Sequence, residues 1–400
     1  MKKTVSKIFG LAVLSLATLT TSCSSDDSNN NNGGDSTFVV DRNNLTGTIN
    51  DGEVILESGT YKLTGKLIVG NNATLIIRPG VKIEATQLQP NQFEEVRYIA
   101  VAQGGKIDVQ GTATNPVVMT AEEERPSAWG GLVICGRAPI NKGATASAEV
   151  SDLTYGGTDV MDNSGSIRYL RIEYSGYSYN SDKEFNGVSF FGVGKGTKVE
   201  YVQVYEGSDD GFEWFGGTVD AKYLVVTNKN ATNVGDDLFD WTEGWNGNGE
   251  NWYGVRTNAG NRGIEADNNS NNHLASPISF PIIKNLTLVG MGSGSDTSAE
   301  SQAMKLRVGT KGKFDNVVLK GFKTGFDVQH NETLSYVGVD LLATKVRFED
   351  VTTKSKGTDS TTPVANTVDV SGVYTEDNTA TGAGNGSGVP TWAAGWTVNP

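Results

Sequence analysis

Cysteine and histidine are scarce in this chain, and their scarcity excludes several classes of protein. Of 400 residues, two are cysteine (Cys23 and Cys135) and two are histidine (His273 and His330). Two cysteines cannot build the disulfide framework of a small secreted scaffold. Two histidines argue against a His-rich zinc site and a Ser-His-Asp triad, although a single histidine remains available for chemistry. Cys135 ends the apolar run that starts at Leu132, which predicts a buried, unreactive thiol.

Positive charge is the second shortage. Lys and Arg number 33 against 46 Asp and Glu, which gives a formal net charge of −13 at pH 7. Such an acidic chain repels nucleic acid and gains nothing from anionic lipid, so we expect neither as a partner. The same excess of carboxylates can attract cations.

Proline is also infrequent, with 10 residues, whereas glycine is abundant, with 50. Asn, Thr and Val are common as well. This composition is typical of many short strands separated by tight turns, and it does not suggest a helical protein.

The amino terminus is predicted to be a signal peptide that spans residues 1–22. A lysine-rich start is followed by an apolar segment, Ile8 to Leu19, which is too short to span a bilayer. Small residues, Thr20 to Ser22, then precede Cys23. This arrangement resembles a bacterial lipoprotein signal, although Thr20 departs from the usual aliphatic residue. The resemblance implies that Cys23 becomes the lipidated first residue; a cleaved signal followed by an incidental cysteine is the alternative.

Residues 23–36 are predicted to be the lipidated cysteine and a flexible tether. Ser24 to Asp27 resembles the acidic export tag of Bacteroidota lipoproteins, which implies an outer-membrane protein that is lipid-anchored and faces the cell exterior. Ser28 to Ser36 offers no apolar residue to bury. We therefore expect the folded part of the protein to begin at residue 37.

A short phrase recurs through the middle of the chain. Its copies begin at residues 187, 211, 238, 263, 303 and 325, so the steps are 22 to 27 residues except for one of 40. One coil of a parallel β-helix takes roughly this many residues, and we assign the longer step to an insertion, Asn268 to Ser279. Apolar and polar residues alternate within each phrase, as in a strand with one buried face. A second strand family follows, at 198–202, 221–225, 283–287 and 314–318.

These patterns predict an all-β chain in which residues 37–400 form a single right-handed parallel β-helix. A β-propeller would repeat at longer intervals, and a hairpin sandwich would need Asn-Gly turns, so both fit less well. Stacked coils should bury one internal column of apolar residues. That column is Phe212, Phe239, Ile264, Met304 and Phe326. Trp392 and Trp396 are predicted to belong to a C-terminal segment that caps the open end of the helix.

The opening turns carry a family resemblance. The phrases ATLIIRPGVKIEA, GKIDVQGTATNPVVMT and WGGLVICGRAPIN resemble those of a Bacteroidota outer-membrane lipoprotein family with a right-handed parallel β-helix. The resemblance covers most of residues 50–350. The function of that family is poorly defined, so the resemblance implies a fold and a location without implying an activity.

Strand alternation also predicts which residues face outward. The first outward column is Ser189, Glu213, Asp240, Glu265, Lys305 and Asp327, and a parallel column two residues later includes Asp267 and Arg307. Adjacent coils lie ~4.8 Å apart, so neighbouring carboxylates repel by about 1 kcal/mol per pair in water. Either a bound Ca²⁺ or the nearby Lys305 and Arg307 should offset this repulsion.

The same face resembles the active face of calcium-dependent β-helix polysaccharide lyases. The resemblance implies that Glu213, Asp240, Glu265 and Asp267 bind Ca²⁺. It further implies Lys305 as the base that removes a proton beside a uronate carboxylate, with Arg307 or Arg262 as the carboxylate clamp. The chain departs from the pattern because asparagines, not a lysine, follow Glu265. The alternative is that these charges pair with one another and solvate the face, which favours a non-catalytic protein.

Two further features of the sequence allow two interpretations each. The pairs Asp209-Asp210 and Asp236-Asp237 precede the same strand on successive coils, where they either cap backbone N–H groups or bind a metal. The loop Glu243 to Gly260 carries Trp245, Trp252 and Tyr253. These aromatic side chains either bind sugar rings or form a packed lid.

Three functions are compatible with these features. The favoured one is a surface binding or accessory lipoprotein for a glycan or a partner outer-membrane protein, assisted by calcium. The second is a calcium-dependent lyase acting on uronate-containing polysaccharides. The third is a structural cell-surface protein without a small ligand.

Overall fold

The computed structural model describes residues 36–88, 96–180, 183–230, 235–257, 260–359 and 365–400. The predicted signal peptide, the lipidation site Cys23 and the tether up to residue 35 lie outside the described residues and stay predictions. In the part of the chain that is described, no helix has the length and apolar character needed to cross a membrane.

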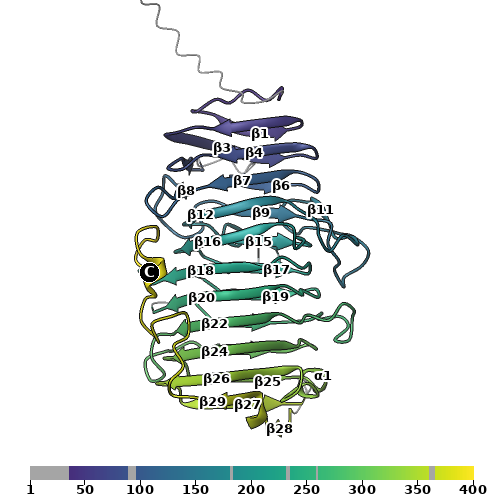
Figure 1. The fold of residues 1–400 in the computed structure, drawn as a ribbon, viewed down its shortest axis with the longest axis vertical. Coiled ribbons are helices and arrows are strands. Elements are labelled where there is room, and N and C mark those ends of the chain that lie inside the picture. The colour runs from purple at the N-terminus through teal and green to yellow at the C-terminus, as the bar shows by residue number, and fades with distance from the viewer. Residues whose placement is uncertain (1–35, 89–95, 181–182, 231–234, 258–259, 360–364) are drawn as a thin grey trace, which may run out of the picture. The chain divides into compact units, whose positions relative to one another are not determined.

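Residues 36–400 confirm the predicted parallel β-helix. Twenty-five strands form one large, mostly parallel sheet that winds through successive coils (Figure 1). The first coils consist of β1 (Leu45–Ile49), β2 (Gly52–Leu56), β3 (Thr60–Val69), β4 (Ala73–Ile77), β5 (Lys82–Ala85), β7 (Lys106–Gln110) and β8 (Val117–Ala121).

Later coils alternate one short and one long strand. We call the first set the short-strand column: β6 (Tyr98–Val101), β9 (Leu132–Cys135), β15 (Val188–Phe191), β17 (Phe212–Phe215), β19 (Phe239–Thr242), β21 (Ile264–Ala266), β23 (Gln302–Leu306), β25 (Thr324–Gln329) and β27 (Thr353–Thr358). The long-strand column is β12 (Gly165–Glu173), β16 (Lys198–Tyr205), β18 (Ala221–Asn228), β20 (Asn248–Arg256), β22 (Ile282–Val289), β24 (Gly312–Lys320), β26 (Leu341–Glu349) and the short final member β29 (Tyr374–Glu376).

Small elements decorate the coils. They are the hairpins β10 (Ala146–Ser147) with β11 (Thr154–Tyr155) and β13 (Ser178–Asn180) with β14 (Lys183–Glu184), the helices α1 (Asn331–Leu334), η1 (Ser371–Val373) and η2 (Thr391–Ala393), and the strand β28 (Thr367–Val368).

The predicted internal column is confirmed. Phe212 pairs in register with Phe239, Phe239 with Ile264, and Ile264 with Met304, which in turn pairs with Phe326. All five side chains have no exposed surface. Burying a large apolar side chain stabilises the fold by about 1.5–3 kcal/mol, so this column is a main source of stability and fixes the register of the outward residues.

Each long strand bends at one residue in the left-handed region. The bend residues occupy the same position in successive coils: Tyr169, Tyr201, Tyr223, Asn251, Asn285, Asn316 and Lys345, with φ between 49° and 60°. Asparagine tolerates this conformation, whereas a tyrosine loses roughly 1–2 kcal/mol. Stacking offsets part of that loss, because the rings of Tyr169 and Tyr201 lie 4.4 Å apart and those of Tyr201 and Tyr223 lie 4.3 Å apart. The asparagines form a ladder in which Asn316 donates to Asn285 at 2.8 Å.

The last residues, 377–400, form what we call the C-terminal strap, which lies beside this line of bends (Figure 1). Trp396 meets Tyr169 and Tyr201 edge-on, with centroids 5.8 and 5.9 Å away, and Trp392 meets Tyr223 at 5.3 Å. The prediction that these two tryptophans cap the open end of the helix is wrong. They instead pack against half-buried tyrosine rings on the flank of the β-helix.

A second apolar cluster covers the outward face of the early coils. Cys135, Phe191 and Phe215 from the short-strand column pack there against Tyr155 and Phe185. Burial raises the pKa of the Cys135 thiol to about 12, which confirms the prediction of an unreactive cysteine. The polar part of the outward face therefore begins only beyond this cluster.

Candidate functional site

The outward residues of the short-strand column lie directly above one another, as predicted. Glu213 pairs in register with Asp240, Asp240 with Glu265, and Glu265 with Lys305. They alternate with the buried column and therefore project from the opposite face of each strand. Charges on successive coils are neighbours, and the electrostatics of this face depend on how they pair.

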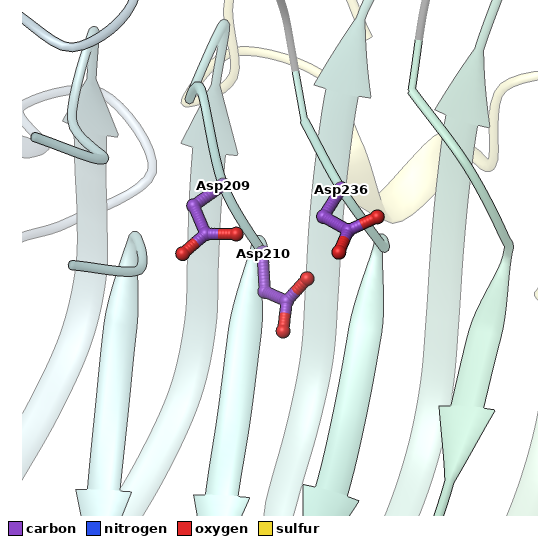
Figure 2. Close-up of side chains that lie close together, drawn as sticks. All are labelled: Asp209, Asp210 and Asp236. Carbon is purple, nitrogen blue, oxygen red and sulfur yellow. The ribbon is translucent and has the colours of Figure 1, made fainter. Parts of the chain in front are cut away.

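One part of the face is an accumulation of carboxylates, which we call the acidic cluster: Asp209, Asp210, Glu213, Asp236 and Asp240. Carboxylate oxygens of Asp209, Asp210 and Asp236 lie within 4.8 Å of one another (Figure 2), and those of Asp210, Glu213 and Asp240 do so as well. Arg262 approaches this cluster only at Asp236, at 4.0 Å. Among the described residues, no lysine or arginine forms an ion pair with the other four carboxylates of the acidic cluster.

Burial and mutual repulsion both act on the protonation of the acidic cluster. Burial raises the pKa of Asp210, Glu213 and Asp240 well above the ordinary values, and the neighbouring carboxylates raise each pKa further. Hydrogen bonds compensate only in part: the Asn186 side chain donates to Glu213 at 2.6 Å. The acidic cluster is therefore stabilised by anything that supplies positive charge, either a proton or a cation.

The capping interpretation is confirmed for the second aspartate of each pair, Asp210 and Asp237. The backbone N–H of Asp237 donates to Asp210 Oδ1 at 2.8 Å, and the N–H of Arg262 donates to Asp237 Oδ1 at 2.7 Å. The side chains of Asp210 and Asp237 thus each accept a hydrogen bond from a backbone N–H in the turn of the next coil. Because Asp210 also lies among the carboxylates of the acidic cluster, capping does not prevent it from offering its second oxygen to a ligand.

The donor set suits a hard cation. Every side chain of the acidic cluster offers oxygen, and hard cations such as Ca²⁺ take clustered carboxylate oxygens, whereas zinc and copper favour nitrogen and sulfur. Of the four predicted ligands, Glu213 and Asp240 belong to the acidic cluster. Glu265 lies next to the cluster, with a carboxylate oxygen within 4.8 Å of those of Asp237 and Asp240.

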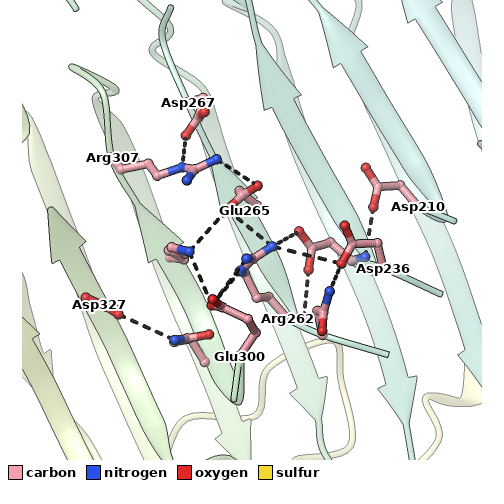
Figure 3. A network of polar contacts seen from close by, with 12 residues as sticks. Asp210, Asp236, Arg262, Glu265, Asp267, Glu300, Arg307 and Asp327 are labelled. Carbon is pink, nitrogen blue, oxygen red and sulfur yellow. Dashed lines mark hydrogen bonds and ion pairs between the residues drawn. The ribbon is translucent and has the colours of Figure 1, made fainter. Parts of the chain in front are cut away.

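Further along the face, acids and bases form what we call the ion-pair network (Figure 3). Arg262 contacts Asp237 at 3.0 Å, Glu265 at 3.2 Å and Glu300 at 3.2 Å. Lys305 contacts Glu300 at 3.2 Å and Glu265 at 3.7 Å. Arg307 contacts Glu265 at 3.1 Å and Asp267 at 2.9 Å. The two guanidinium groups and one ammonium group therefore offset the carboxylates around them.

This pairing describes the surroundings of the residues for which the sequence suggested catalytic or metal-binding roles. Lys305 is 8 % exposed at its side chain, and its ammonium group lies between the carboxylates of Glu265 and Glu300, so it already has two ion-pair partners. Arg307 is the nearest cation to Asp267, so Asp267 lies in an ion pair and in none of the carboxylate groups within metal-binding distance. The ion pairs that the alternative expected for Lys305 and Arg307 are present, and Arg262 is paired as well.

The prediction that Trp245, Trp252 and Tyr253 are exposed for sugar binding is wrong. Trp245 and Trp252 have no exposed surface and Tyr253 is 3 % exposed. Residues 248–256 are the long strand β20, and Trp252 pairs in register with Leu224 and Leu286. The rings of Trp245 and Trp252 stack on Trp214 at 4.6 and 5.0 Å inside the coil. Trp245 and Trp252 fill the core of the coil. Tyr253 instead packs in a separate cluster with Ala383, Ala393 and Trp396 of the C-terminal strap, so none of the three is an exposed binding platform.

Comparison with known families identifies residues 47–397 with a family model described as "Pectate-lyase like beta helix domain". No curated protein and no solved structure matches the chain.

Proposed function

The chain belongs to the pectate-lyase-like β-helix family, and from this premise we propose that it binds an acidic glycan through a divalent cation held by the acidic cluster. Membership fits a carbohydrate-related or polysaccharide-lyase-like role. The observation that carries the proposal is the acidic cluster, in which two groups of three carboxylates share Asp210 and the oxygens within each group lie within 4.8 Å of one another. No lysine or arginine of the described chain pairs with these carboxylates apart from the 4.0 Å contact of Arg262 with Asp236.

Calcium is the cation that we propose. Asp210, Glu213 and Asp240 would supply carboxylate oxygens, and Ca²⁺ takes 6–8 oxygen ligands. Three protein side chains leave room for water and for the carboxylate of a uronate unit. A chain with a net charge of −13 repels an acidic polysaccharide, so the cation is needed to join the two.

Binding is favoured over catalysis because of the ion-pair network. Elimination from a uronate requires a base that can accept a proton, and Lys305, Arg262 and Arg307 are each held by carboxylates. We therefore retain the lyase as an outcome of the test below. We also retain the proposed setting: an outer-membrane lipoprotein anchored through Cys23, facing the cell exterior, with a glycan or an outer-membrane protein as its partner.

Retention on immobilised polygalacturonate and alginate tests the proposal. The purified protein is expected to be retained with Ca²⁺ and released by a chelator. Paired substitution Glu213→Gln and Asp240→Asn should abolish retention, whereas Glu53→Gln, which removes an exposed carboxylate of β2, should leave it unchanged. Retention without Ca²⁺, or in the double variant, contradicts the proposal. Release of unsaturated, ultraviolet-absorbing product would instead establish the lyase.

A further inference from the structure

The inserted segment between β21 and β22 helps to form a pocket that the acidic cluster does not use. The pocket has a volume of about 520 Å³, and its lining includes Ser270, His273, Arg307, His330, Glu332 and Asp359. Volumes of this size are typical of sites for small organic ligands. Both histidines of the chain lie here, with ring centroids 4.8 Å apart.

The backbone around the two histidines of the pocket is closely packed. Gly309, at φ +88°, lies against the insertion, and a Cβ there would collide with the carbonyl oxygen of His273. His330 has φ 73° and ψ 140°, a backbone conformation that costs a residue other than glycine of order 1–3 kcal/mol and is found mostly at functional sites. The surrounding coils therefore hold both rings in place at an energetic cost.

Hydrogen bonds fix opposite tautomers on the two rings. Nδ1 of His273 lies 2.9 Å from a carboxylate oxygen of Glu332. An ionised carboxylate can only accept, so Nδ1 of His273 is the donor in this hydrogen bond. The backbone N–H of Val308 donates to Nδ1 of His330 at 3.2 Å, so the neutral His330 ring carries its proton on Nε2. In their neutral forms, His273 Nε2 is an acceptor and His330 Nε2–H is a donor.

This tautomer pattern argues against a transition metal. A metal-bound imidazole needs a lone pair on the nitrogen that faces the metal, and His330 has none on Nε2. The pair instead offers one acceptor and one donor at adjacent positions. A sugar hydroxyl both donates and accepts, so two neighbouring hydroxyls of one ring match the two imidazoles.

Charge in the pocket selects among sugars. The guanidinium of Arg307 is already paired with Glu265 and Asp267, which leaves Glu332 and Asp359 as uncompensated carboxylates when the imidazoles are neutral. Burial lowers the pKa of His330, with further lowering from His273 and Arg307, so that ring is neutral near pH 7. A uronate would meet net negative charge here, whereas an uncharged sugar would not.

We propose that the pocket around His273 and His330 binds an uncharged sugar unit through its hydroxyl groups. Arg307 connects the pocket to the ion-pair network, and the pocket lies two to three coils from Asp240, a distance of about 10–15 Å. If the proposed cation site holds an acidic unit, the whole face recognises a glycan that contains both acidic and neutral sugars. This last step rests on the proposed function; binding in the pocket does not.

Histidine NMR provides a selective test, because the chain has two histidines and both lie in the pocket. In protein labelled only at histidine, ¹⁵N shifts should show one Nδ1–H and one Nε2–H tautomer. Addition of the methyl glycosides of glucose, galactose and mannose at millimolar concentration should shift both rings for at least one sugar, and galacturonate should bind at least tenfold more weakly.

Three variants separate this proposal from the cation site. Glu332→Gln should weaken binding of the neutral glycoside about tenfold, as expected for loss of one hydrogen bond to a charged group. Ser270→Ala, a smaller change, should weaken it less, and Glu213→Gln should leave the histidine shifts unchanged. Identical tautomers, no shift with any of the three neutral glycosides, or tighter binding of galacturonate would overturn the proposal, even if calcium-dependent retention succeeds.

Discussion

Replacing Asp240 by asparagine tests the electrostatics of the acidic cluster directly. The Asp240 carboxylate lies within 4.8 Å of Asp210 and Glu213 and has no ion-pair partner among the described residues. At that separation, two unit charges repel by about 1 kcal/mol in water and by about 3 kcal/mol at an effective dielectric constant of 20. Asp240→Asn should therefore stabilise the cation-free protein at pH 8 by about 1–3 kcal/mol.

The pH dependence of the free energy of unfolding has a defined sign. The pKa of Asp240 is raised in the folded state by burial and by Glu213 and Glu265, so the folded protein binds a proton more tightly than the unfolded chain. Stability of the wild-type protein therefore decreases as pH rises from the ordinary carboxyl pKa of about 4 through the raised value. The asparagine variant should show less of this decrease, and its advantage should vanish near pH 4.

Urea unfolding in the presence of a chelator, at pH 4, 6 and 8, measures both effects. Ca²⁺ at about 100 times its dissociation constant should stabilise the wild-type protein by about 2.7 kcal/mol and Asp240→Asn by much less. Glu53→Gln, on the exposed face of β2, is the matched control and should change neither quantity. The reasoning is refuted if Asp240→Asn destabilises the protein at pH 8, or if its effect is the same at pH 4.

Two other substitutions test other parts of the structure. Glu265→Gln leaves Arg262, Lys305 and Arg307 without their shared acceptor, so it should cost about 3–5 kcal/mol; a change below 1 kcal/mol in urea unfolding would show that the ion-pair network is not cooperative. Trp396→Ala removes a fully buried ring and should cost about 3–5 kcal/mol while making the C-terminal strap susceptible to limited proteolysis, whereas Trp396→Phe should retain most of the protection.

The repeat and the outward column were predictable because they follow from spacing and alternation. Strand residues alternate between two faces, so aligning phrases that begin at 211, 238 and 263 places Glu213, Asp240 and Glu265 on one line. How the charges pair was not predictable. Glu300, which contacts both Arg262 and Lys305, lies in a loop outside the repeated phrases, and no periodic pattern locates it.

The burial of Trp245 and Trp252 could have been inferred. The second strand family has members at 221–225 and 283–287. Two phrases of the first family, which begin at residues 238 and 263, lie between them. Each coil needs one strand of both families, so a second-family strand was missing between residues 238 and 263. Trp252 occupies the position of Leu224 and Leu286 in that strand. The alternation argument failed because the segment is rich in glycine and asparagine, which are depleted in strands and therefore suggested a loop.

The C-terminal strap has a consequence for how the protein reaches its native state. A solenoid is usually stabilised by contacts between neighbouring repeats and folds outward from any point along its axis. Here the backbone of Val398 exchanges hydrogen bonds with the side chain of Gln203, 195 residues earlier. The middle coils thus acquire this covering only after residues 377–400 have been synthesised, so a chain that stops before them would expose the tyrosine rings to proteases and chaperones.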